Sequence, residues 1–534
     1  MTYTISRSVG QDFDCPAQSL FQALAETAAK YPEHNAIYFY NHTVTYQTLL
    51  AQVTKLSAYL YEKGVRSGDR IGIMLPNCPH YVVAFYAAAR LGAIVVQVNP
   101  MYTPREVEYT LADSGAKALV VMDRLYAAFS KTDFVKALDS LVLVSLAPNA
   151  DLEIPANGVA FQQALQEDLP IPALAVVDPA EDVAVLQYTG GTTGRSKGAM
   201  LTHRNLIANA WQSIDMLGGE SISAEDKILA VIPLFHVYGM SVAMNMALFT
   251  GAGMILLPRF DVEEVLQAIK THQPRLYPGV PTMYVAIANH PKAQEYGIDA
   301  IEICNSGSAP LPFEVKQLFE SKTGGRIMEG YGLSEASPVT HSNRYNLPHK
   351  PNSIGPVANG TEAAIVDLGG SGEAVPVGQL GELIVKGPQV MKGYWNMPEE
   401  TDATMRDGWL YTGDIARMDE DGYYYIVDRK KDMIISSGFN VYPRDIEEVL
   451  YQHPNVREAV VVGVPDEYRG ESAKAFIVLK EQKEGIDYQQ QIDTFCREHL
   501  APYKVPRLYE FRAELPKTAV GKILRRALRD QVTK

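Results

Sequence analysis

An alternation of apolar runs and helical segments in the first hundred residues constrains the fold more than any other feature. In residues 46–64 apolar side chains recur at helical spacing, and Gly64 ends the pattern. Residues 70–76 follow as a short apolar run, 79–92 as another helical segment and 93–100 as another apolar run. A strand–helix–strand unit of this kind joins parallel strands, so the sequence predicts a parallel sheet covered by helices.

The length of the chain, 534 residues, predicts two or more domains, because one hydrophobic core does not grow to that size. After about residue 353 short strands with frequent glycines replace the alternation, and from about residue 432 helices and strands are mixed again. We therefore predict an α/β fold. A large N-terminal domain, residues 1–430, would hold parallel-sheet α/β subdomains plus a small β-barrel subdomain, and residues 431–534 would form a small α+β C-terminal domain.

Charge and composition exclude several classes of protein. The formal net charge of −14 disfavours nucleic acid as a partner, since phosphate backbones bind positive surfaces. The four cysteines form no CxxC pair, which argues against a disulfide framework and a structural zinc site. We expect no secretory signal and no transmembrane segment, because no apolar run is long enough. A cytoplasmic enzyme is the resulting expectation; peripheral contact with a membrane and a homodimer are left open.

A glycine-rich loop follows the apolar run at residues 181–189 and reads YTGGTTGRSKG from Tyr188 to Gly198. Glycines permit tight turns that direct successive backbone N–H groups at anionic oxygens. Threonine hydroxyls and the Lys197 ammonium add donors, so the loop predicts phosphate binding rather than a plain surface turn. It is not a Walker A loop, which requires Gly-Lys followed by Ser or Thr, because Ser196 precedes Lys197 and a glycine follows it.

This loop resembles the signature of the adenylate-forming superfamily, which includes acyl- and aryl-CoA synthetases, peptide-synthetase adenylation domains and firefly luciferase. Further motifs of that family follow in order: PLFHVYG (233–239), NSGSAP (305–310), EGYGLSE (329–335), YTGD (411–414), DRKKD (428–432) and PKTAVGK (516–522). The texts around YTGGTTG and DRKKDMIISSGFNVYP look most like bacterial long-chain fatty acyl-CoA synthetases. Ser196 and Ser334 depart from the commoner Pro and Thr, but neither change removes a group that the chemistry needs.

The resemblance implies an ATP site and a Mg²⁺ site. Tyr331 would stack on adenine, and Asp414 would accept hydrogen bonds from the ribose hydroxyls. Glu335, with Thr189, would hold Mg²⁺, which prefers oxygen ligands and few carboxylates. The ATP-binding residues that the resemblance implies are Thr189, Gly190, Gly191, Thr192, Thr193, Gly194, Lys197, Gly307, Ser308, Ala309, Glu329, Gly330, Tyr331, Gly332, Ser334, Asp414, Arg429 and Lys522.

Lys522, His236 and Glu335 are the implied catalytic residues. Attack of a carboxylate on the α-phosphorus brings two anions together, so the Lys522 ammonium would lower the barrier electrostatically. The resemblance also implies that the C-terminal domain is mobile and rotates about a hinge, so that the thiol of coenzyme A can then attack. The implied hinge and coenzyme A residues are Lys430, Lys431, Gly438 and Arg444, although a solvated run of charges explains Lys430 and Arg444 equally well.

The acyl group is expected beside His236. Amino-acid-activating relatives carry an aspartate at this position to bind the substrate amine, so the histidine disfavours an amino acid substrate. The residues that follow, Val237, Tyr238 and Gly239, would line an aliphatic tunnel or belong to the plain core. We therefore expect an AMP-forming ligase that joins a fatty acid to coenzyme A.

Several alternatives remain. The first is a medium-chain or aryl (4-coumarate-like) CoA ligase. Another is a fatty acyl-AMP ligase that loads a carrier protein, but such enzymes carry an insertion near the hinge, and none is apparent between Asp428 and Asp432. A luciferase-like oxygenase and a non-catalytic binding module are the remaining classes. A non-catalytic binding module would not need to keep Lys197, Glu335 and Asp414 together with Lys522.

Overall fold

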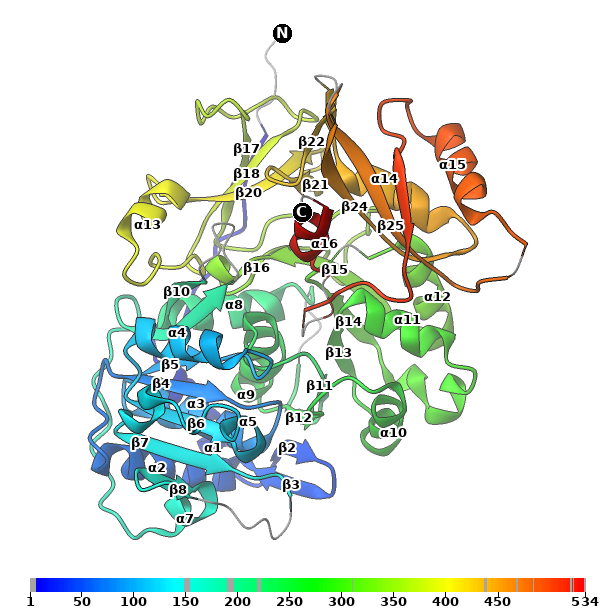
Figure 1. The fold of residues 1–534 in the computed structure, drawn as a ribbon. Coiled ribbons are helices and arrows are strands. Elements are labelled where there is room, and N and C mark those ends of the chain that lie inside the picture. Colours follow the sequence, from blue (N-terminus) through cyan, green and yellow to red (C-terminus); the bar gives the residue numbers. More distant parts are fainter. Residues whose placement is uncertain are drawn as a thin grey trace.

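The computed structural model of the chain describes residues 6–147, 154–189, 196–218, 222–309, 311–436, 439–466, 469–483, 485–518, 521 and 523–532. These residues form four β-sheets, of seven, eight, six and five strands (Figure 1). The first three sheets come from the N-terminal part of the chain, and the fourth comes from the C-terminal part. No helix of the described residues combines the length and the apolar character that crossing a membrane requires.

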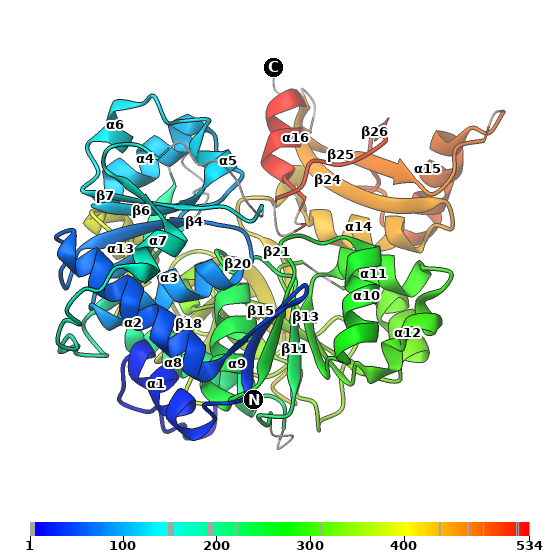
Figure 2. The same cartoon turned by 90° about the horizontal axis from the view of Figure 1, so that it is seen from below.

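The seven-stranded sheet has the order β10-β9-β5-β4-β6-β7-β8 and is parallel except for the β9–β10 pair. Its strands are β4 (Arg70–Met74), β5 (Ile94–Gln97), β6 (Ala118–Met122), β7 (Ser140–Val144), β8 (Gly158–Ala160), β9 (Val183–Thr189) and β10 (Lys197–Thr202). Figure 2 shows helices on both of its sides. They are α2 (Tyr46–Glu62), α3 (Pro79–Arg90) and α7 (Phe161–Gln166) on one side, and α4 (Pro104–Ser114), α5 (Asp123–Tyr126) and α6 (Asp133–Lys136) on the other.

The eight-stranded sheet has the order β16-β15-β14-β13-β11-β12-β2-β3, with antiparallel pairs only at its two edges. Its strands are β2 (Asn35–Phe39), β3 (His42–Thr45), β11 (Lys227–Ala230), β12 (Gly253–Leu256), β13 (Leu276–Gly279), β14 (Ile303–Ser306), β15 (Arg326–Gly332) and β16 (Val339–Ser342). One large hydrophobic core joins this sheet to the seven-stranded one. The helices around it are α1 (Leu20–Lys30), α8 (His203–Asp215), the π-helix η1 (Gly239–Asn245), α9 (Met246–Thr250), α10 (Val262–His272), α11 (Pro281–Asn289), η2 (Ala293–Tyr296), η3 (Ile298–Ala300) and α12 (Phe313–Thr323).

The six-stranded sheet is antiparallel throughout, as expected for the β-rich segment after residue 353. Its strands are β1 (Arg7–Val9), β17 (Glu362–Val366), β18 (Gly381–Lys386), β19 (Met405–Arg406), β20 (Trp409–Met418) and β21 (Tyr424–Arg429). Two short helices, η4 (Ser334–Ala336) and α13 (Pro398–Thr404), precede β16 and β19 respectively.

The five-stranded sheet belongs to the C-terminal part and has a hydrophobic core of its own. Figure 1 shows its orange and red elements above the green strands of the eight-stranded sheet. They are β22 (Ile434–Ser436), β23 (Phe439–Val441), α14 (Pro443–Gln452), β24 (Val456–Asp466), β25 (Gly470–Leu479), α15 (Tyr488–His499), β26 (Leu508–Phe511) and α16 (Arg525–Val532).

The elements predicted from periodicity are confirmed. The segment 46–64 forms α2, and the Thr45 side chain caps it by accepting a hydrogen bond from the Thr48 N–H. The strand–helix–strand unit 70–100 is β4, α3 and β5, and its two strands are parallel. The α/β class with parallel sheets is therefore confirmed, whereas a domain boundary at residues 430 and 431 stays a prediction.

Candidate active site

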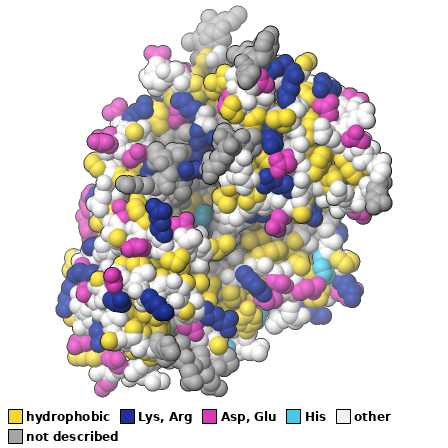
Figure 3. All heavy atoms as spheres, in the orientation of Figure 1, with side chains coloured by type: hydrophobic (Ala, Val, Ile, Leu, Met, Phe, Trp, Pro, Cys, Tyr) yellow, Lys and Arg dark blue, Asp and Glu magenta, His cyan; other side chains and the backbone are white. Residues whose placement is uncertain are grey.

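A cleft of about 510 Å³ lies where the carboxyl ends of parallel strands meet the antiparallel sheet. Open α/β sheets bind ligands at that end of their strands. The face drawn in Figure 3 is hollowed near its middle. The predicted site residues that line the cleft are Thr189, Lys197, His236, Val237, Tyr238, Gly307, Ser308, Gly330, Tyr331, Gly332, Ser334, Glu335, Asp414, Arg429, Lys430 and Lys431.

The Asp414 carboxylate organises one end of the cleft. Asp414 on β20 lies opposite Arg429 on β21, and Arg429 Nε is 3.2 Å from Asp414 Oδ1. The Tyr331 hydroxyl donates a hydrogen bond to the other carboxylate oxygen. The negative charge of Asp414 raises the pKa of the Arg429 guanidinium, while burial and then Asp414 raise that of the Tyr331 phenol. This end of the cleft is thus a fixed anionic acceptor beside an aromatic ring, which suits a nucleoside.

Two backbone features shape the wall beside Tyr331. Gly332 approaches the chain so closely that a Cβ atom there would lie 2.0 Å from the Pro338 carbonyl oxygen, so only glycine fits. Ser308 adopts a left-handed conformation with φ of +68°, which is uncommon for a residue other than glycine. Backbone strain of this kind persists where the surrounding structure imposes it and is common at binding sites.

The hairpin of β9 and β10, where phosphate binding was predicted, contributes Thr189 and Lys197 to the lining of the cleft. Thr189, the last residue of β9, pairs with Lys197, the first of β10. The Ser196 hydroxyl donates to the Thr189 carbonyl at 2.7 Å, and the Ser196 carbonyl accepts from Tyr109 on α4 at 3.0 Å. Ser196 thus links the end of β9 to α4. The predicted loop residues Gly190, Gly191, Thr192, Thr193 and Gly194 lie outside the described residues.

Glu335 lies in η4 on the same side of the cleft as the hairpin residues. The Tyr394 hydroxyl donates to Glu335 Oε1 at 2.7 Å, which leaves the second carboxylate oxygen for another partner. Within the described part of the chain, no group of three or more His, Cys, Asp or Glu side chains is placed to hold a metal ion. A single carboxylate fits Mg²⁺, which binds through few carboxylates plus phosphate and water.

The strand that leads to His236 is held by a buried amide from the other sheet. Asn77, which follows β4, donates from Nδ2 to the Ala230 and Ile232 carbonyls at 3.1 and 2.9 Å. Its Oδ1 accepts the Leu234 N–H at 2.7 Å. Because Asn77 is 1% exposed, these three bonds replace those that water would otherwise supply. The seven-stranded sheet thereby fixes the position from which the half-buried His236 enters the cleft.

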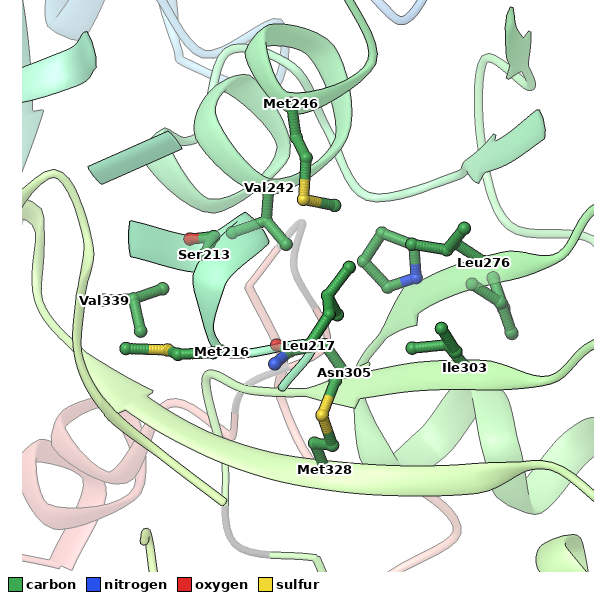
Figure 4. Close-up of a pocket in the computed structure, with 12 residues that line it drawn as sticks. Ser213, Met216, Leu217, Val242, Met246, Leu276, Ile303, Asn305, Met328 and Val339 are labelled. Atoms are coloured by element: carbon green, nitrogen blue, oxygen red, sulfur yellow. The ribbon is translucent and has the colours of Figure 1, made fainter. Parts of the chain in front are cut away.

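A smaller, mainly apolar cavity of about 20 Å³ adjoins the cleft, because Asn305 and Val339 line both. Figure 4 shows Val242 and Met246 reaching from the helix above towards Ile303 and Met328 on the strands below. This volume holds roughly one water molecule. The π-helix η1 contributes Val242, and π-helical turns are frequent at functional sites. The residues that line the cavity are Ser213, Met216, Leu217, Val242, Met246, Leu276, Tyr277, Pro278, Ile303, Asn305, Met328 and Val339.

Other predicted residues lie away from the cleft lining. Glu329 is buried, its carboxylate accepts the Leu311 N–H at 3.3 Å, and burial raises its pKa. Gly239 is the buried first residue of η1. Arg444, in the first turn of α14, donates to the Ile426 carbonyl at 2.7 Å and pairs with Glu448 at 3.1 Å. Ala309 is half-buried beside Ser308 and is not among the lining residues.

Gly438 and Lys522 lie outside the described residues. The glycine before Lys522 is described: a Cβ atom on Gly521 would lie 3.1 Å from Thr282 Oγ1 and 3.4 Å from Val280 Cγ2. Val280 joins β13 to α11, and Thr282 lies in the first turn of α11. The glycine before the predicted lysine therefore lies close to the start of α11, just beyond the end of β13.

Sequence reasoning missed several residues of the cleft region, among them three with polar side chains that contact predicted residues. Tyr394 and Glu382 line the cleft, and Glu400 on α13 forms an ion pair with Lys197. Glu382 also pairs with Lys430, with Oε2 3.2 Å from Nζ. In the sequence Tyr394 is only a tyrosine that follows a glycine, and Glu382 and Glu400 are single acidic residues. Residues of these kinds occur on any protein surface, so the sequence does not mark them as part of a site.

Comparisons with known proteins agree with this geometry. Residues 24–395 match the family described as AMP-binding enzyme, and residues 445–522 match the AMP-binding enzyme C-terminal domain. The chain is 46% identical to a long-chain-fatty-acid–CoA ligase of Bacillus subtilis over 98% of this chain and 96% of that one. It is 36% identical to a feruloyl-CoA synthase of Amycolatopsis over 93% and 96%. The solved structure of an anthranilate CoA ligase in complex with anthranoyl-AMP superposes with a TM-score of 0.88 at 28% identity, over 97% and 98%.

Proposed function

This chain belongs to the AMP-binding enzyme family, and on that premise we propose that it joins long-chain fatty acids to coenzyme A at the expense of ATP. In the first step a carboxylate oxygen attacks the α-phosphorus of ATP. A new P–O bond forms, the bond to the β-phosphate bridge breaks, and pyrophosphate leaves. In the second step the thiolate of coenzyme A attacks the acyl carbonyl, a thioester forms and AMP leaves.

The residues of the cleft divide this work. Asp414 and Tyr331 bind and orient the nucleoside, and Lys197 offers an ammonium to the phosphates. Mg²⁺ at Glu335 and Thr189 would neutralise charge that develops on the phosphates. Lys522 would supply a positive charge beside the incoming carboxylate.

The observation that carries the choice of acid is the methionine-lined cavity beyond Asn305. Its lining is mainly apolar, and it shares Asn305 and Val339 with the cleft that His236 lines, so an acid whose carboxylate sits in the cleft can direct its tail there. The space is too small for an alkyl chain, but Met216, Met246 and Met328 have flexible, unbranched side chains that can move aside. Burial of each methylene then contributes about 0.8 kcal/mol, which favours long tails.

The experiment is a steady-state panel of acids with ATP, Mg²⁺ and coenzyme A, in which AMP, pyrophosphate and thioester are measured. Hexanoate, decanoate, palmitate and oleate test length, and benzoate and ferulate test shape. We expect kcat/KM to rise with chain length up to palmitate or oleate. A failure to consume coenzyme A with any of these acids would disprove the proposal.

An aryl CoA ligase is the second candidate, because the similar feruloyl-CoA synthase acts on an aromatic acid by its name. The same panel separates the two: a preference for ferulate over palmitate would favour the aryl ligase. The small present size of the cavity fits a ring no better than an alkyl chain, whereas its three methionines fit a flexible tail better.

One substitution tests the division of work between the two steps. We expect Lys522→Ala to lower the rate of adenylate formation about 10²- to 10³-fold, the usual cost of removing one electrostatic group from a transition state. Thioester formation from supplied acyl-adenylate should stay within about threefold of the unsubstituted enzyme, as measured by release of AMP. An equal loss in both steps would contradict the assignment.

A further inference from the structure

Lys197, the phosphate-facing lysine, has an anionic partner within the chain. Its Nζ forms an ion pair with the Glu400 carboxylate, 203 residues further along the sequence. The Lys197 side chain is 12% exposed and that of Glu400 is 40% exposed, so the pair lies at the edge of the cleft rather than in open solvent. An anion that binds Lys197 must therefore share the ammonium with Glu400 or displace it.

Backbone hydrogen bonds fix the position of Glu400. The segment before α13 runs beside β10: the Met200 N–H donates to the Gly393 carbonyl at 2.9 Å, and the Trp395 N–H to the Gly198 carbonyl at 2.8 Å. The Tyr394 N–H then donates to Thr401 Oγ1 at 2.9 Å, which ties the first turn of α13 to this segment. Glu400 is thus held against the start of β10 by structure that does not depend on the ion pair.

Tyr394 connects this pair to the candidate metal ligand. The Tyr394 ring centroid lies 5.0 Å from Lys197 Nζ, and its hydroxyl donates to Glu335 at 2.7 Å. Burial, followed by the charge of Glu335, raises the pKa of the Tyr394 phenol, and the charge of Glu400 contributes in the same direction. Together Lys197, Glu335 and Glu400 carry one net negative charge, on the side of the cleft that faces the phosphates.

We infer that Glu400 is a positioning residue that competes with nucleotide phosphates for Lys197, weakens the binding of ATP and speeds the release of pyrophosphate. This inference rests on the proposed activation of an acid by ATP. Pyrophosphate carries several negative charges, so a lysine without an internal partner would hold it tightly after the adenylate has formed. The ion pair between Glu400 and the Lys197 ammonium re-forms as pyrophosphate leaves. No covalent bond is made or broken in this exchange, and no proton is transferred.

The chain provides a matched control one residue away. Glu399 lies in the same first turn of α13 and is exposed, so Glu399→Gln removes the same charge from the same helix without touching the Lys197 pair. Glu400→Gln keeps the size of the side chain and removes its charge. Glu400→Asp keeps the charge but withdraws the carboxylate by one methylene.

The test measures the KM for ATP, the product-inhibition constant of pyrophosphate and the KM for palmitate, in assays without pyrophosphatase. We expect Glu400→Gln to lower the first two about two- to fivefold, the upper part of the range for loss of one partly exposed charge contact. We expect Glu400→Asp to lower them less, and Glu399→Gln to change them less than twofold. The KM for palmitate should stay constant in all three variants.

A merely structural role for Glu400 would raise the KM for ATP and lower the thermal stability, which is the opposite sign and overturns the inference. Equal effects of Glu399→Gln and Glu400→Gln would also overturn it, because net charge alone would then explain them. If Glu400→Gln does not fold, an unchanged pyrophosphate constant in Glu400→Asp overturns it. Absence of AMP formation by the unsubstituted enzyme would instead refute the proposed function.

Discussion

The two cavities that share Asn305 and Val339 differ in almost every physical respect. The cleft has about 510 Å³ of space, and charged and hydroxyl side chains line it together with apolar ones. The apolar cavity has about 20 Å³ and is lined mainly by methionine, valine, leucine and isoleucine, with no charged side chain among its lining residues. Under the proposed function the nucleotide side, which is the cleft, is already open, whereas the acyl side, which is the apolar cavity, would have to open. A nucleotide is the same for every acid, but the acid is what the enzyme must discriminate.

The contacts explain this difference. On the nucleotide side, Asp414 is held by a cross-strand pair with Arg429 and by the Tyr331 hydroxyl, so its position is over-determined. On the acyl side, packing of flexible thioethers replaces directional bonds, and such packing rearranges at modest cost. Substitutions on the two sides should therefore affect different kinetic constants.

The largest effect is expected from Asp414→Asn. The asparagine amide keeps the shape of the aspartate side chain, but it leaves Arg429 without its anionic partner and the ribose without a charged acceptor. Hydrogen bonds to charged groups contribute about 1.5–3 kcal/mol. We expect kcat/KM for ATP to fall about 10- to 100-fold, with the order of preference among acids unchanged. Steady-state kinetics with hexanoate and palmitate check both parts, and Asp402→Asn, at an exposed position of α13, serves as the control. A changed acid preference would break the separation of the two cavities.

A second effect, about tenfold, is expected from Val242→Phe on the acyl side. The ring fills the small cavity, and exclusion of two methylenes costs about 1.6 kcal/mol. We expect kcat/KM for palmitate to fall while that for hexanoate and the KM for ATP stay within about twofold. Overpacking itself destabilises by about 1–3 kcal/mol. Val142→Phe overpacks the buried strand β7 instead and should lower stability without shifting the chain-length profile.

The fold was largely predictable because its signals are local. Helical spacing and glycine punctuation in residues 46–100 predict α2, β4, α3 and β5, and the structure confirms them. The pairing of the sheets was not predictable. Asn77 joins the loop after β4 to residues 230–234 by side-chain hydrogen bonds. A single asparagine in a turn gives no sign in the sequence that its amide will make the hydrogen bonds that a neighbouring strand would otherwise make.

The candidate site was predictable where chemistry needs particular residue types in a motif. Asp414, Glu335 and Lys197 were found in this way, and all three line the cleft. Glu400 was not found, because an acidic residue in a first helical turn is common and its partner lies 203 residues away. The methionine cavity was missed for another reason: apolar side chains that line a substrate path and those that fill a core have the same composition.

A third, smaller effect is expected from Asn77→Ala. Asn77 does not line the apolar cavity, and it would act on the acyl side through residues 230–234, which lead to His236. Its loss removes the side-chain partner of the Ile232 carbonyl and of the Leu234 N–H, whereas the Ala230 carbonyl keeps the Leu257 N–H at 3.3 Å. An unpaired buried group costs about 1–3 kcal/mol, so we expect stability to fall by about 2–4 kcal/mol. The strand before His236 should loosen and raise the KM for palmitate about three- to fivefold, with the KM for ATP unchanged. Thermal unfolding and kinetics measure these effects, with Asn289→Ala, at an exposed position of α11, as the control. A rise in the KM for ATP alone would contradict the link between Asn77 and the acyl side.

The smallest effect is expected from Met328→Leu, and it tests whether softness rather than volume distinguishes the acyl side. The exchange nearly conserves volume and should change stability by less than about 1.5 kcal/mol. A branched leucine adapts less readily than a thioether, so kcat/KM for palmitate should fall about two- to threefold and that for hexanoate should not change. Competition between the two acids in one reaction resolves so small a ratio, and Met254→Leu, buried in β12, is the matched control. An unchanged ratio of kcat/KM for palmitate to that for hexanoate would mean that the cavity opens by movement of its helices rather than of its methionines. The difference between the two cavities would then arise from the backbone and not from the side chains.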